Sequence, residues 1–196
     1  MIGPSFKAGF LGFIAALAVC CSQATPYQPE SVSSAVRGGY SHQQIAPDLF
    51  RVRFHGNELT SRETVEAYLL YHAAEVTLEQ GGDWFKIIDR ETEHTITRER
   101  RLDPLYRPWY GPGYSYWLPY WSYRFQGGGW LFWDPWHADV FWADRLNGRE
   151  VEEFEATAEI IIGHGPVPQN DPRAYGARQV IADIGPKVVR PRERKP

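Results

Sequence analysis

The sequence predicts an α+β fold, in which one antiparallel or mixed sheet carries two helices on one face. Three observations predict it: segments where apolar and polar residues alternate, segments with apolar residues at helical spacing, and glycines or prolines between them. The expected order is β-α-β-β-α, with a long aromatic-rich insertion before the third strand. A ferredoxin-like arrangement is one topology that satisfies this order.

The first predicted strand and the first predicted helix follow one another. Apolar and polar residues alternate strictly over residues 49–55, which is typical of a half-buried strand. Thr60 with Glu63 three positions later matches a capping box, so the helix is expected to begin at Thr60. The glycine pair at Gly81 and Gly82 is expected to end it.

Two further strands are predicted, at residues 84–97 and 153–162. The second of these alternates most clearly, and its inward positions are Phe154, Ala156, Ala158, Ile160 and Ile162. Its glutamates are expected to form a solvated face rather than a set of catalytic carboxylates. These acidic residues are Glu150, Glu152, Glu153 and Glu155.

A second helix is predicted after residue 170, with Asp171 as N-cap and Pro172 at the first helical position. Gly185 followed by proline is expected to stop it. Residues 187–189 are expected to add a short edge strand. The predicted domain therefore spans residues 48–189, followed by a basic, solvated tail over 190–196.

The insertion, residues 103–148, is dominated by aromatic residues. Between Tyr106 and Trp142, 16 of 37 residues are aromatic, which disfavours simple disorder. Three interpretations remain open: the segment covers the bare face of the sheet, it docks an envelope protein or the bilayer interface, or it stacks sugars such as peptidoglycan. The residues predicted to make such contacts are Trp117, Trp121, Trp130 and Trp133.

Residues 1–21 have the parts of an exported signal peptide. The apolar run from Ala8 to Val19 would make about 18 Å of helix, which is too short for a bilayer core of about 30 Å. The residues that follow resemble a bacterial lipobox, so Cys20 or Cys21 is expected to be acylated. Several acyl chains hold a protein firmly on a membrane. Ser22 favours the outer membrane over the inner.

Residues 22–47 lack apolar periodicity and contain prolines and glycines, so they are predicted to form a flexible tether. Without Lys7 and the tail after Val189, 16 basic residues stand against 23 acidic ones. Such an acidic body argues against nucleic acid as a partner.

We find no catalytic or cofactor-binding motif in the sequence. No cysteine follows Cys21, which excludes thiol chemistry in the rest of the chain. His137, Asp139 and Asp144 are the best candidates for a metal-dependent enzyme, but no second histidine stands at metal-ligand spacing. His72 lies on the apolar stripe of the first helix and is expected to be a hydrogen-bonded core histidine.

Seven segments of the chain carry a resemblance to a known family: residues 25–29, 39–41, 51–57, 62–71, 73–75, 171–175 and 177–181. On these segments the chain resembles an uncharacterised family of Gram-negative bacterial envelope lipoproteins. The resemblance implies a periplasm-facing, lipid-anchored location and supports the fold, but it implies no activity. The expected function is a structural or interaction module of the envelope, and the alternative is a module that stacks peptidoglycan glycans on the insertion.

Overall fold

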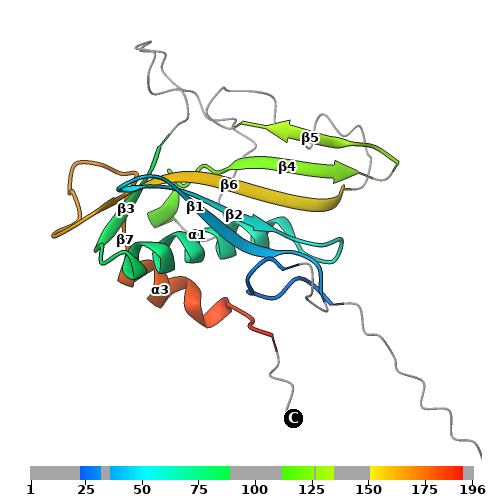
Figure 1. Cartoon of the computed structure of the whole chain (residues 1–196), viewed down its shortest axis with the longest axis horizontal. Coiled ribbons are helices and arrows are strands. Elements are labelled where there is room, and N and C mark those ends of the chain that lie inside the picture. Colours follow the sequence, from blue (N-terminus) through cyan, green and yellow to red (C-terminus); the bar gives the residue numbers. More distant parts are fainter. Residues whose placement is uncertain (1–22, 32–35, 89–111, 126, 135–150, 192–196) are drawn as a thin grey trace, which may run out of the picture.

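The computed structural model describes residues 23–31, 36–88, 112–125, 127–134 and 151–191. Over these residues it has the predicted α+β class, with two helices and one antiparallel sheet; the sheet contains seven strands, more than the sequence predicts (Figure 1). The strands are β1 (Gly39–Ala46), β2 (Leu49–His55), β3 (Trp84–Ile88), β4 (Tyr120–Phe125), β5 (Trp130–Trp133), β6 (Val151–Gly163) and β7 (Ala174–Gly176). The helices are α1 (Arg62–Glu79) and α3 (Ala177–Ile184), with short 3₁₀ turns η1 (Pro112–Tyr114) and η3 (Gly185–Lys187).

Strand β6 is the centre of the sheet. One of its edges pairs with β2, and the other is shared by β3 at the C-terminal half and β4 at the N-terminal half. Strands β1, β7 and β5 then lie outside β2, β3 and β4 respectively. The order β2-β6-β3, with α1 between β2 and β3 in the chain, follows a split β-α-β arrangement.

Both helices lie on the same side of the sheet, which we call the helix-side face (Figure 1). The alternating residues of β2 and β6 point to this side, and Val52, Phe54 and Ile160 are fully buried beneath α1. The opposite side of the sheet is called the outer face. The single apolar face of each strand therefore determines on which side the helices pack.

The N-cap of helix α1 lies one residue later than the capping residue predicted, Thr60. Its N-cap is Ser61, whose hydroxyl accepts a hydrogen bond from Thr64 N at 3.2 Å. Thr60 is instead buried, and its hydroxyl accepts from Thr25 N at 2.8 Å. The helix ends as expected, because Gly81 adopts φ 76°, a left-handed conformation that favours glycine.

The second helix also begins later than predicted. Asp171 does not cap a helix: its carboxylate accepts from Arg173 N at 3.1 Å and pairs with Lys86 at 2.8 Å. The residues after Arg173 form β7, which pairs with β3, and α3 begins only at Ala177. At its other end, η3 replaces the edge strand predicted over 187–189.

The tether prediction is wrong for the described part of residues 22–47. Residues 39–46 form β1, and Tyr27 is almost completely buried. The backbone at Gly39 passes so close to Gln28 that an added Cβ would lie 2.4 Å from the Gln28 carbonyl oxygen. The domain therefore includes the described residues before the predicted boundary at residue 48.

Candidate functional site

The outer face carries a row of side chains that crosses four strands. His55, Glu155, Ser122 and Phe132 are cross-strand neighbours on β2, β6, β4 and β5. Directly paired residues in antiparallel strands point to the same side of the sheet, so these four share the outer face. The row changes from ionic at β2 to aromatic at β5.

The ionic part is centred on Glu153, which is only 2% exposed. Its carboxylate accepts from Arg124 at 2.6 Å and from Arg37 at 3.4 Å, and His55 lies 3.5 Å away. Glu159 is likewise buried and pairs with Arg51 at 2.7 Å. The prediction of a solvated glutamate face is therefore wrong for Glu153, because arginine side chains cover the carboxylate.

The N-terminal segment contributes to this network through Glu30. Its carboxylate accepts from Arg53 and lies 3.4 Å from His55 Nδ1. Loss of hydration raises the pKa of Glu155, and the nearby Arg53 partly opposes that rise. Contacts among the side chains of residues 30, 53, 55, 153 and 155 thus hold together segments that are far apart in the sequence.

Removing the charge of Glu153 is expected to destabilise the domain. We expect Glu153→Gln to lower the free energy of unfolding by about 1–3 kcal/mol, since two arginines lose their buried acceptor. Glu152→Gln is the matched control, because Glu152 lies 3.5 Å from the same Arg124 but is far more exposed. Urea unfolding measures both, and equal effects of the two changes would contradict the assignment of Glu153 as the centre of the network.

Three of the four tryptophans predicted to be contact residues are buried. Trp117, Trp121 and Trp133 are at most 1% exposed, so they offer no surface to a partner, and the prediction is wrong for them. Trp130 is 39% exposed, and its ring meets His55 edge-on at 5.8 Å. Of the four, only Trp130 lies where a partner can touch it.

The described part of the insertion extends the sheet and its core. Trp117 contacts Phe85 and Tyr175 edge-on, and Trp121 packs against Phe154 on the helix-side face. This agrees with the interpretation that the insertion completes the core. It does so beside the helices, however, and not by covering the bare outer face as expected.

Strand β5 exposes three consecutive apolar residues, which we call the aromatic edge: Trp130, Leu131 and Phe132. Phe132 is 73% exposed on the outer face, and Leu131 is 40% exposed on the helix-side face. Among the described strands β5 pairs only with β4. Runs of exposed apolar residues on an edge strand are typical of surfaces that contact a partner.

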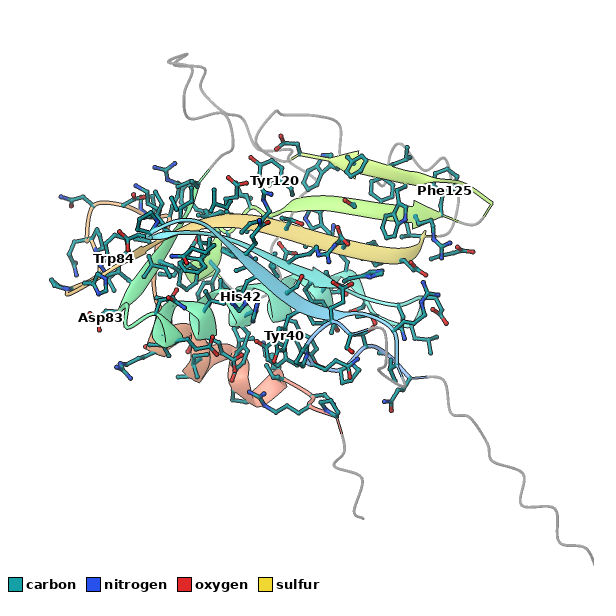
Figure 2. All side chains as sticks on the ribbon, viewed as in Figure 1. Tyr40, His42, Asp83, Trp84, Tyr120 and Phe125 are labelled. Atoms are coloured by element: carbon teal, nitrogen blue, oxygen red, sulfur yellow. The ribbon has the colours of Figure 1, made fainter. Side chains whose placement is uncertain are left out.

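A second polar cluster lies between β1 and α1. His72 is buried as predicted, with Nδ1 3.0 Å from the Tyr27 hydroxyl and Nε2 3.1 Å from His42 Nδ1. The Tyr27 hydroxyl also donates to Glu75, which accepts from Arg190 at 3.0 Å. Figure 2 shows Tyr40 and His42 on β1, on the side toward α1, and the Tyr40 ring stacks on His72 at 4.3 Å.

These contacts determine the proton positions in the cluster. Because Tyr27 gives its only proton to Glu75, it must accept from His72 Nδ1–H, which leaves His72 Nε2 to accept from His42. Burial raises the pKa of Tyr27 and lowers that of His72 to about 3, so both are neutral at pH 7. Neither Tyr27 nor His72 therefore changes its protonation near neutral pH.

The arrangement instead fastens the two ends of the described chain to α1. Tyr27 brings the N-terminal segment, and Arg190 lies over the Tyr27 ring at 5.3 Å while pairing with Glu75. Arg190 therefore belongs to the folded domain, which corrects the solvated tail predicted from residue 190. Its pKa is raised, chiefly by the hydrogen bond to Glu75.

A pocket of about 240 Å³ lies between η1 and α3. Three polar side chains of its lining, Tyr114, Gln179 and Asp183, already bond to one another. The Tyr114 hydroxyl donates to Asp183 Oδ2 at 2.6 Å, and Gln179 donates to Asp183 Oδ1 at 2.7 Å. Burial and this contact raise the pKa of Tyr114. With both carboxylate oxygens occupied, the pocket gives little reason to expect a ligand.

Within the described ranges no group of three or more histidine, cysteine or acidic side chains is placed to hold a metal ion. The candidate metal ligands His137, Asp139 and Asp144 lie outside these ranges, as do Cys20 and Cys21. None of the helices in the described part is long and apolar enough to cross a membrane. Comparison with family models, curated proteins and solved structures finds no match to this chain.

Proposed function

We propose that this chain is a lipid-anchored protein of the Gram-negative cell envelope that faces the periplasm and serves as a structural or interaction module. The signal-like segment 1–21, the cysteines at its end and the resemblance to envelope lipoproteins support the location. The charged side chains of the outer face bond to one another, as Arg51 does to Glu159 and Arg124 to Glu153, rather than standing around a reactive group. Binding is therefore better supported than catalysis.

The observation that carries the proposal is the exposed aromatic edge. Phe132 stands on the outer face beside Ser122, with the paired Glu155 next to it on β6. A large apolar side chain ringed by polar groups is a common arrangement at protein interfaces. The partner it fits is an envelope protein that presents an extended apolar segment, because an edge strand can accept a further strand.

The location is tested by metabolic labelling with an alkyne fatty acid. The wild type is expected to take up label, and Cys20→Ser or Cys21→Ser is expected to abolish it, which identifies the acylated residue. The double variant is the control. A wild-type protein that is exported without label would contradict the lipid anchor, because nothing would then hold the domain at the membrane.

The interaction surface is tested with a photocrosslinking amino acid at residue 132 in cells. We expect one defined envelope partner, identified by mass spectrometry, to be captured there and not by the same crosslinker at Gln43. Gln43 is an exposed outer-face position on β1, at the other side of the sheet. Equal capture at both positions would show that the aromatic edge is not a specific contact surface.

The alternative function is glycan binding, which one observation favours. Trp130 and Phe132 lie two residues apart on the same face, next to Arg124 and Ser122, so an apolar ring face and hydrogen-bonding groups stand together. Peptidoglycan sedimentation separates the two functions. Retention of the wild type with loss in Trp130→Ala would favour glycans over a protein partner.

A further inference from the structure

The folded domain reaches to within two or three residues of Cys21 or Cys20, the cysteines proposed to carry the lipid. Gln23 is already held in place, because Asn57 Nδ2 donates to its carbonyl oxygen at 2.8 Å. Two residues later Thr25 is buried, and its hydroxyl accepts from Asn57 N at 2.9 Å. The start of the described chain is thus fastened to the loop between β2 and α1.

The chain between Gln23 and the lipid is therefore short. Residue 23 is two positions after Cys21 and three after Cys20. Whatever its conformation, a segment of that length reaches at most about 7–11 Å, since an extended chain spans at most about 3.6 Å per residue. If Cys20 or Cys21 is acylated, as the proposed function holds, the Asn57 end of the domain must lie next to the lipid headgroups.

The same end of the sheet carries the tip of the β4–β5 hairpin. His55 of β2 pairs with Glu155 of β6, while Arg124 of β4 pairs with both Glu153 and Trp130. The loop after His55 and the start of β5 are thus at one level along β6. Figure 1 shows the blue N-terminal segment, the start of α1 and the β4–β5 hairpin toward the same end of the molecule.

Apolar side chains are exposed at this end from two separate elements, the turn before α1 and the start of β5. Leu59, directly after the loop that holds Gln23, is 49% exposed, and Leu131 at the hairpin is 40% exposed. Trp130, on the outer face at the start of β5, is 39% exposed. Leucine with tryptophan suits the boundary between headgroups and acyl chains, where the indole keeps a polar and an apolar side.

We infer that the domain does not float on a tether but rests on the bilayer, with Leu59, Trp130 and Leu131 inserted at the lipid interface. This rests on the proposed lipid anchor. The end of the sheet at which β6 begins then faces the bilayer. Phe132, on the outer face, remains accessible to a partner beside the membrane. Three acyl-independent contacts with lipid hold the domain in one orientation.

The test uses the full acylated chain in phosphatidylcholine vesicles, with a single new cysteine carrying an environment-sensitive fluorophore. Cysteines are placed at Leu59, at Leu131 and, as the matched control, at Ile45, which is 43% exposed. Ile45 lies toward the far end of β1, near the Asp48 carbonyl that accepts from Ile162 N. Strand β2, seven residues long, separates the two ends by about 20 Å. The non-acylated member of the cysteine pair is replaced by serine.

We expect the probes at residues 59 and 131 to emit at shorter wavelength and to be quenched by nitroxide-labelled lipid, while the probe at residue 45 stays open to aqueous iodide. Equal iodide access at all three positions, in protein that floats with the vesicles, would overturn the inference and leave the anchor intact. Protein that does not float with the vesicles would overturn both. Circular dichroism verifies that each variant is folded.

Discussion

Replacing Trp121 by alanine is expected to lower the free energy of unfolding by about 3–5 kcal/mol. The side chain is 1% exposed and packs against Phe154 on the helix-side face, so its removal leaves a cavity between β4 and β6. Trp130→Ala, on the neighbouring strand, is expected to cost less than about 1 kcal/mol because its ring is partly in solvent. The two residues come from one aromatic segment and differ in burial.

Urea unfolding followed by far-ultraviolet circular dichroism measures both changes without depending on tryptophan emission. The two variants should also affect partner binding in different ways. Trp130→Ala keeps the fold and changes the contact surface, whereas Trp121→Ala weakens binding only by destabilising the fold. If Trp121→Ala were as mild as Trp130→Ala, Trp121 would not be a core residue, and the burial of the insertion would be in doubt.

The second large effect is a loss of stability in acid that depends on His72. Burial, followed by the nearby His42, lowers the pKa of His72 from 6.5 to about 3. Between these values the unfolded chain binds a proton at this residue and the folded chain does not. The contribution of neutral His72 to the free energy of unfolding is therefore fully present above pH 6.5. It falls as the pH drops toward 3, by about 1.4 kcal/mol per pH unit at most.

The measurement is urea unfolding at pH 7 and pH 4.5 of the wild type and of His72→Phe. The variant loses hydrogen bonds to Tyr27 and His42, so we expect it to be less stable at pH 7. It should nevertheless lose less stability on acidification than the wild type, by about 2 kcal/mol. His164→Gln, which removes a histidine at an exposed position, is the matched control. If the wild type and His72→Phe lost the same free energy of unfolding between pH 7 and pH 4.5, the acid sensitivity would not come from His72.

The candidate contact surface was only partly predictable. Aromatic richness draws attention to the segment that contains β4 and β5, but composition does not say which ring points inward. Trp130 and Trp133 of β5 are three residues apart and so point to opposite faces, and the pairing of β4 with β5 and β6 decides which of these faces is the core. Phe132, the most exposed of these aromatics, was not singled out because nothing in the sequence separates it from its buried neighbours.

Local periodicity by itself determined β2, α1 and the central part of β6. Each has one apolar face, so its spacing of 2 or 3.6 residues is visible in the sequence. The burial of His72 followed from the same helical stripe. The lipobox-like cysteines and their place after a short apolar run also need no tertiary information, since they are a linear signal.

Only the tertiary structure decided what happens to segments without such periodicity. Strand β1 is an edge strand with mostly polar, exposed residues, and it forms because β2 offers backbone partners. The turn residues at Asp171 suit either a helix cap or a turn, and pairing with β3 selects β7. The glutamates of β6 look solvated in sequence but are covered by arginines from elsewhere in the chain. In each case the deciding partner is distant in sequence, and that contact exists only once the sheet has formed.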